Sequence, residues 1–228
     1  MRLRRRRHPR RRPRAVAPVS IAAYQPLCER LGLDPDALPY TPNWSAAPDF
    51  LELIVDHVLA RKPAVIVECG SGMTTLMLAR CCALNGGGHV YSLENGADYA
   101  ANTRAAIARH GLAQHSTVIH APLRPYTLDG REYQWYDVGQ LTIGAIDMLV
   151  IDGPPGFIQK HSRYPALPLL RDRLADDCAI FMDDAARPDE QEIVEMWLVA
   201  VPPPAHEYIH TERGCSVLRQ QPHKAAPR

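Results

Sequence analysis

The sequence lacks several features that would mark whole classes of protein. No stretch approaches the roughly 18 consecutive apolar residues that a membrane-spanning helix needs. The six cysteines include no C-x-x-C pair, which argues against a disulfide scaffold and favours reduced thiols in a cytoplasmic protein. There is no G-x-x-x-x-G-K-[ST] phosphate loop. With 46% hydrophobic and 22% charged residues, the 228-residue chain is typical of a globular protein with one sizeable domain.

Acidic residues are missing from the N-terminal end. Residues 1–14 contain nine arginines and no acid, and the first acidic residue is Glu29. Removing those nine charges from the net charge of +1 leaves −8, so the rest of the chain is acidic. We expect the arm at 1–14 to be a disordered tail or an over-long start rather than a site for an anionic partner. A secretion signal is not expected, because the stretch at 15–24 is short and broken by Pro18.

Five prolines at 15–45 predict an irregular lead-in with one short helix near Pro26 to Leu31. A longer helix follows, with Ser45 as its expected N-cap and an apolar stripe at Phe50, Ile54 and Val58. We therefore place the folded domain at 46–220 and a polar tail at 221–228.

Within this domain, short apolar segments alternate with helical patterns. The expected parallel strands lie at 64–69, 89–94, 116–120, 147–152 and 178–183, and the helices at 75–84, 98–110, 166–175 and from 188 onward. The last two strands, 206–211 and 215–219, are only three residues apart and must be antiparallel. The fold class is α/β, a doubly wound, mostly parallel sheet of about seven strands ending in an antiparallel hairpin.

A glycine-rich loop joins the first strand to a helix. Gly70 and Gly72 let the backbone turn sharply and approach a ligand. Glu94 ends the next strand, where a carboxylate can accept hydrogen bonds from ribose hydroxyls. Thr75 stands where the dinucleotide fingerprint has glycine or alanine. Glu68, two residues before Gly70, suits a ligand with an ammonium and a sulfonium, which indicates S-adenosylmethionine (SAM).

The E-x-G-x-G loop, the acid in YSLEN, the DMLVIDGPPG segment and the terminal hairpin together resemble the class I SAM-dependent methyltransferases across most of 46–220. The resemblance implies that the glycine loop holds the methionine part of SAM, the second-strand acid the ribose, and the residues after the third strand the adenine. The cofactor-binding residues that follow from the loop and the resemblance are Glu68, Gly70, Ser71, Gly72, Thr74, Glu94, Asn95, Ala121, Leu123 and Asp152.

Three carboxylates are expected at the carboxyl edge of the sheet, since Asp152 ends the fourth strand and Asp183 and Asp184 end the fifth. Such neighbours need a cation or a proton between them, and an all-oxygen set suits Mg²⁺, Mn²⁺ or Ca²⁺ rather than zinc. The arrangement resembles metal-dependent catechol-type and macrolide-sugar O-methyltransferases, although the catechol-type lysine is here Pro155. Alternatively, Asp183 or Asp184 caps the following turn.

Two catalytic residues are predicted. Asp152 would face the transferred methyl or the acceptor, and His161 is the first choice for a general base because its ordinary pKa is near neutrality, unless it is a solvated loop histidine. Four aromatic residues at 126–136 indicate either a wall of the acceptor pocket or a small hairpin packed on the sheet.

The expected function is SAM-dependent O-methylation of a small molecule, either a sugar or a hydroxylated natural product. One alternative is a nucleic-acid methyltransferase guided by the basic arm, but G-P-P-G at 153–156 is not the [DNS]-P-P-aromatic motif of base-amino methylation. An NAD-dependent oxidoreductase and an inactive scaffold are further alternatives. We expect a small-molecule acceptor, no nucleic acid and no membrane as partners, and leave a homodimer open.

Overall fold

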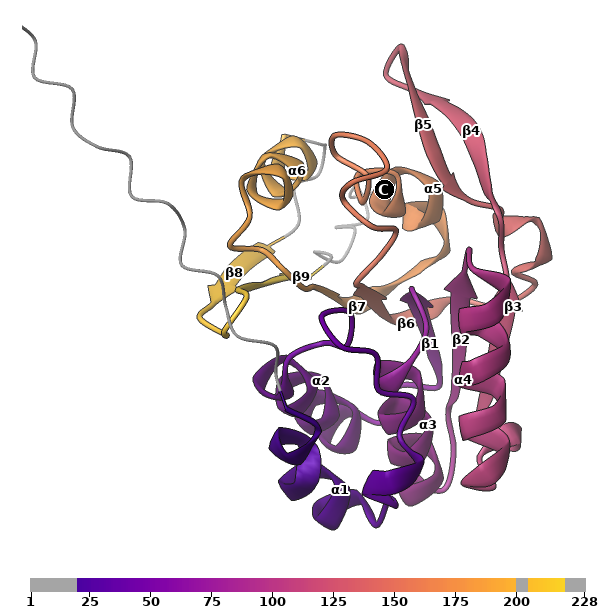
Figure 1. Ribbon diagram of the computed structural model, residues 1–228. Coiled ribbons are helices and arrows are strands. Elements are labelled where there is room, and N and C mark those ends of the chain that lie inside the picture. Colours follow the sequence, from indigo (N-terminus) through magenta and orange to yellow (C-terminus); the bar gives the residue numbers. More distant parts are fainter. Residues whose placement is uncertain (1–19, 200–204, 220–228) are drawn as a thin grey trace, which may run out of the picture.

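The computed structural model describes residues 20–199 and 205–219. The basic arm at 1–14 and the polar tail at 221–228 lie outside the described residues, so the predictions for them stay predictions. The described chain forms a central sheet with helices on both of its faces (Figure 1). No helix of the described residues has both the length and the apolar character needed to cross a bilayer.

The central sheet has seven strands in the order β3-β2-β1-β6-β7-β9-β8. The first five in this order are parallel, whereas β9 runs antiparallel to both β7 and β8, so the predicted fold class is confirmed. The strands are β1 (Val65–Cys69), β2 (His89–Glu94), β3 (Ser116–His120), β6 (Ile146–Ile151), β7 (Leu174–Met182), β8 (Ala205–Ile209) and β9 (Cys215–Arg219).

The inner strands are apolar on both faces because both faces are covered. Ile66 and Met148 point to the core on one face, and Val67 and Leu149 to the core on the other. The first face is covered by α2 (Pro48–Arg61), α3 (Met73–Asn85) and α4 (Ala97–Arg109), and the second by α5 (Ala166–Leu170) and α6 (Pro188–Leu198) (Figure 1).

Two predicted helix boundaries were wrong. Helix α2 has Ala47 as its N-cap, because the Ser45 hydroxyl instead accepts a hydrogen bond of 3.0 Å from the Thr41 N–H and closes the preceding turn. The helix predicted at 166–175 ends at Leu170, because Leu174 already pairs with Ile146 as the first residue of β7.

The lead-in packs on the same core as the sheet. Its short helix, α1 (Gln25–Leu31), lies where the prolines predicted one, and buries Leu27 and Leu31 against the first face. The Tyr24 hydroxyl donates a hydrogen bond of 2.9 Å to the carbonyl of Ala46, which fixes the end of the lead-in to the start of α2. The lead-in at 15–45 and the domain predicted from 46 onward therefore share one core across the boundary between them.

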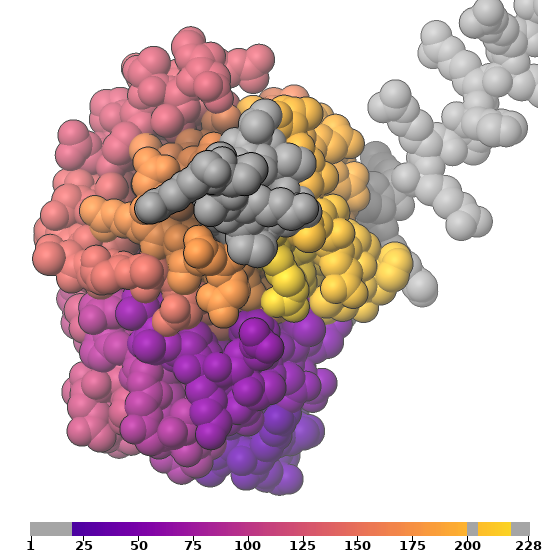
Figure 2. All heavy atoms as spheres, turned by 180° about the vertical axis from the view of Figure 1, so that it is seen from behind, coloured from indigo at the N-terminus to yellow at the C-terminus, as the bar shows by residue number. Residues whose placement is uncertain are grey.

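The aromatic-rich segment is an antiparallel hairpin of β4 (Leu123–Leu128) and β5 (Arg131–Tyr136). It projects from the body of the molecule (Figure 1), and its buried Tyr133, Trp135 and Tyr136 join the core of the second face. Seen from behind, the indigo and purple part of the chain forms the lower part of the molecule, and the orange and yellow part lies above it (Figure 2).

Candidate active site

A cavity of about 910 Å³ opens at the carboxyl edge of the parallel strands. Ligands of open α/β sheets bind at this edge because the loops there leave a crevice. Most of the residues predicted to bind the cofactor line it, namely Glu68, Gly70, Ser71, Gly72, Thr74, Glu94, Asn95 and Asp152. Ala121 and Leu123, implied only by the resemblance, are not among its lining residues.

The turn from β1 into α3 depends on glycine. Gly70 has φ +101°, a conformation that residues with a side chain rarely adopt. Gly153, which follows Asp152 on the facing loop, is needed for space: a Cβ there would clash with the Tyr136 hydroxyl oxygen. A side chain at Gly153 would therefore clash, whereas at Gly70 the backbone conformation rather than the space disfavours one.

Glu68 anchors the glycine loop from below. Its Oε2 accepts hydrogen bonds from the hydroxyls of Thr75 (2.6 Å) and Ser92 (2.5 Å), and the Gly72 N–H in turn donates to the Thr75 hydroxyl oxygen at 3.0 Å. Burial raises the pKa of Glu68 from 4.5 to about 8, although both hydroxyls oppose the shift. Thr75, at the position where the dinucleotide fingerprint has a small residue, therefore connects the loop to the buried acid.

Glu94 fixes the opposite side of the same loop. Its Oε2 accepts hydrogen bonds of 3.0 Å from both the N–H and the hydroxyl of Ser71, and its Oε1 accepts one of 2.9 Å from the Gly96 N–H. Glu68 and Glu94 come from neighbouring strand ends and line one shared cavity. The cavity is thus acidic on the side of the glycine loop.

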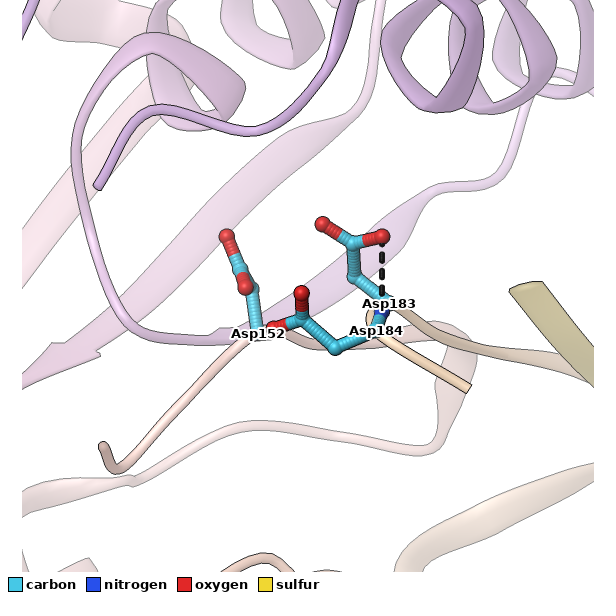
Figure 3. Close-up of side chains that lie close together, drawn as sticks. All are labelled: Asp152, Asp183 and Asp184. Carbon is cyan, nitrogen blue, oxygen red and sulfur yellow. Dashed lines mark hydrogen bonds between the residues drawn. The ribbon is translucent and has the colours of Figure 1, made fainter. Parts of the chain in front are cut away.

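The carboxylates of Asp152, Asp183 and Asp184 come together at the ends of β6 and β7, as the sequence predicted (Figure 3). One oxygen of each lies within 4.8 Å of the others. Burial raises the pKa of Asp152 well above its ordinary value, and the charge of Asp183 adds to the shift. Burial also raises the pKa of Asp183, to about 7. Asp183 also caps the following turn, which was the alternative role, since its Oδ1 accepts a hydrogen bond of 2.8 Å from the Asp184 N–H.

Arg163 lies among these acids. Its Nη2 is 2.8 Å from Asp184 Oδ2 and 3.3 Å from Asp152 Oδ1, and its side chain is only 3% exposed. An oxygen set of this spacing suits a divalent ion, but a guanidinium already contacts two of the three carboxylates. The residues present therefore do not fit Mg²⁺ in the way that the sequence predicted.

His161 lies beside the cavity rather than in its wall. The residue is buried, its Nε2 is 2.7 Å from Glu192 Oε2 on α6, and it is absent from the residues that line the cavity. Its backbone has φ +57°, which turns the loop so that Ser162 and Arg163 follow into the cavity wall. A role as general base stays a prediction, and this geometry does not favour it.

The outer wall contains residues that sequence reasoning missed. Trp44 of the lead-in and Phe157 of the loop after β6 are 52% and 79% exposed, and their ring centroids are 6.0 Å apart in an edge-to-face contact. Tyr136 lines the inner wall, so the aromatic segment is both a hairpin and, at this one residue, part of the pocket. No periodic pattern distinguishes Trp44 or Phe157, but both flank glycine- or proline-rich turns.

A family model described as a methyltransferase domain matches residues 67–185, just over half of the 228-residue chain. The match begins in β1 and ends after Asp184, so it includes the glycine loop, Glu94 and the acidic cluster. No curated protein sequence matches the chain significantly.

Solved structures share the fold over nearly the whole chain. An O-methyltransferase from Bacillus cereus in complex with SAH (S-adenosylhomocysteine) is 17% identical, with a TM-score of 0.64 and coverage of 88% of this chain and 91% of that one. The SAH-bound methyltransferase PaMTH1 of Podospora anserina is 14% identical, with a TM-score of 0.62 and 91% coverage of both chains. The SAM-bound O-methyltransferase TomG of Streptomyces achromogenes is 13% identical, with a TM-score of 0.58 and coverage of 88% and 89%.

Proposed function

This chain belongs to the methyltransferase-domain family, and from that premise we propose that it transfers a methyl group from SAM to an oxygen of a small molecule, a sugar or a hydroxylated natural product. The observation that carries the proposal is that the glycine loop, Glu94 and Asp152 line one cavity. The structures with the same fold support it, since those of Bacillus cereus and Streptomyces achromogenes are named as O-methyltransferases and were solved with SAH or SAM.

The residues present fit SAM. A cavity of about 910 Å³ is at the upper end of the range for small-ligand sites, roughly 300–1,000 Å³, which leaves room for a cofactor and an acceptor together. Glu94 favours a cationic ligand on the side of the glycine loop, whereas Glu68, whose pKa is raised to about 8, supports the loop as a neutral hydrogen-bonded acid. The start of α3 leaves backbone N–H groups for a carboxylate there, since this helix begins at Met73 directly after the loop.

When bound, SAM supplies an electrophilic methyl group on a sulfonium. The chain therefore has two tasks, to hold the acceptor hydroxyl in line with that methyl and to take up its proton. Asp152 lines the cavity with a side chain that is 20% exposed, and its Oδ1 is held by Arg163 while no described residue donates to its Oδ2. We assign the alignment of the acceptor, and the uptake of its proton, to this free oxygen.

The exposed aromatic pair makes the part of the cavity that we assign to the acceptor more apolar than the side of the glycine loop. Trp44 and Phe157 present ring surface at the mouth, and Tyr136 presents a phenol further in. Burial raises the pKa of the Tyr136 phenol well above its ordinary value, so it would act as a neutral hydrogen-bond donor. This combination suits an acceptor with an apolar ring and at least one hydroxyl.

A cytoplasmic location is part of the same proposal, and it is supported by the six cysteines, which are all unpaired and buried. The homodimer stays a prediction, which light scattering of the purified full chain would test.

The proposed function is tested by calorimetric titration of the full chain with SAM, SAH and NAD, followed by a screen of hydroxylated acceptors with mass detection of an added methyl group. We expect SAM and SAH to bind and NAD to give no heat. Binding of NAD without binding of SAM would refute the proposal and favour an oxidoreductase.

A further inference from the structure

The acidic cluster at the ends of β6 and β7 has four carboxyl groups, one more than the three predicted to bind a metal. Besides Asp152, Asp183 and Asp184, the carboxylate of Glu190 at the start of α6 is 3% exposed and lies 3.8 Å from Arg163 Nε. Buried carboxyl groups at such distances require a positive partner or a proton. Arg163 is the cation that the fold places among them.

The Arg163 guanidinium binds backbone carbonyls as well as carboxylates. Its Nη1 donates to the carbonyl oxygen of Asp183 at 2.8 Å, and its Nη2 donates to that of Asp152 at 2.9 Å. One guanidinium therefore joins the ends of β6 and β7 while it also contacts the carboxylates that follow them. A planar group with five N–H donors is suited to this set of acceptors, whereas a lysine could reach fewer of them.

Both carboxylate oxygens of Asp184 already have a cationic partner. Asp184 has Arg163 beside one oxygen and Arg187 Nη2 at 2.8 Å from the other. Asp183 Oδ1 accepts from the Asp184 N–H, while its Oδ2 is buried without a hydrogen-bond partner. An ion bound to Asp184 would have to displace a guanidinium whose side chain is only 3% exposed, and an ion bound beside it would lie next to a like charge.

The loop that carries Arg163 is also fixed in place. The Ser162 hydroxyl donates a hydrogen bond of 3.1 Å to the carbonyl of Pro154, which closes the segment between β6 and α5 on itself. His161, one residue further back, is held by Glu192 at 2.7 Å. The two residues before Arg163 are therefore held by contacts outside the acidic cluster.

We propose that Arg163 takes the position of the divalent cation, so that this chain does not bind a metal ion at the acidic cluster, and that Arg163 is a positioning residue that orients Asp152 toward the acceptor. The second part rests on the proposed function, whereas the first does not. This reverses the expectation of Mg²⁺ drawn from the resemblance to metal-dependent O-methyltransferases.

The test is a titration of EDTA-treated full chain with Mn²⁺, followed by electron paramagnetic resonance. We expect the wild type to show no stoichiometric Mn²⁺ binding at millimolar concentration. We expect Arg163→Met, which removes the charge at similar length, to gain one Mn²⁺ site, and Arg163→Met combined with Asp183→Asn to lose it again. Arg163→Lys is the matched control, which keeps a cation and is expected to bind no Mn²⁺.

Two results would overturn the proposal. One is a stoichiometric Mn²⁺ site in the wild type that Asp183→Asn removes. The other is a folded Arg163→Met that gains no site, since then the guanidinium is not what excludes the ion. If Arg163→Met does not fold, the wild-type titration and its Asp183→Asn control still decide.

The positioning role has its own readout. With an acceptor in hand, Arg163→Lys should lower kcat by about tenfold to 100-fold because the acceptor is misaligned, and should leave the Kd for SAM unchanged. An unchanged kcat would refute that role. Failure to bind SAM at all would refute the proposed function and leave the Mn²⁺ result standing.

Discussion

The Glu68→Gln substitution removes a buried carboxyl group whose ionisation opposes folding. Burial raises the pKa of Glu68 from 4.5 to about 8, so between these values the folded chain holds a proton that the unfolded chain has lost. Stability from this group is therefore complete below pH 4.5 and decreases as the pH rises toward 8. Glutamine has no such titration, and it keeps an oxygen that can accept from the hydroxyls of Thr75 and Ser92.

The size of the effect follows from the shift. At about 1.4 kcal/mol per pKa unit, a change from 4.5 to about 8 corresponds to on the order of 5 kcal/mol. With a urea dependence of about 2.5 kcal/mol per M, the unfolding midpoint of the wild type should fall by about 2 M relative to that of Glu68→Gln across this range.

The assay is urea unfolding followed by circular dichroism at a series of pH values from 5 to about 8.5. Other buried acids, such as Asp183, titrate in both proteins, so the difference between the two curves isolates Glu68. The control is Glu52→Gln on the exposed face of α2, which should run parallel to the wild type. If Glu68→Gln also ran parallel to the wild type, the buried acid under the glycine loop would not be protonated and the reasoning would fail.

Three further predictions concern the cavity. Thr75→Val removes the hydroxyl that the Gly72 N–H and Glu68 share, so it should lower the free energy of unfolding in urea by about 2–3 kcal/mol and weaken SAM binding in calorimetry. Thr75→Ser keeps the hydroxyl and should leave the stability and the SAM affinity unchanged. Equal effects of valine and serine would contradict this. Asp152→Ala should reduce turnover below detection by mass spectrometry while SAM still binds, and an unchanged rate would remove Asp152 from the mechanism. Trp44→Ala and Phe157→Ala should each raise KM for the acceptor by about tenfold, or about 1.4 kcal/mol, without changing the Kd for SAM, and a weaker SAM affinity instead would place the pair at the cofactor.

Much of the fold could be predicted because its strands are buried and short. The bounds of β2, β3 and β9 agree with the apolar segments of the sequence, since a strand covered on both faces has little choice of residue. The end of α5 could not be predicted, because Leu174 to Asp177 fits a helical pattern locally and becomes strand only by pairing with β6. Ser45 failed as an N-cap for the same reason, since its hydroxyl serves a turn that the sequence does not reveal.

In the candidate site, too, some residues could be predicted from the sequence and others could not. The glycine loop, Glu94 and Asp152 follow strand ends, so topology alone brings them to one edge of the sheet. Arg163 is on a loop, and its place among the acids depends on how that loop folds back. One signal was available, because three converging carboxylates imply a nearby cation and Arg163 lies in the polar segment between the strands that carry them. Trp44 is separated from the glycine loop by all of α2 and β1 and shows no such signal.

Two kinds of segment line the cavity. Its cofactor side consists of turns at the ends of core strands, whereas its outer side consists of the 39–46 segment before α2 and the 155–158 stretch, neither of which belongs to the sheet. Replacing those two surface segments would change the acceptor that the cavity binds while it leaves the strand ends on the cofactor side as they are. It also means that a shortened version starting at residue 46 would lose a wall of the cavity together with the part of the core that the lead-in supplies.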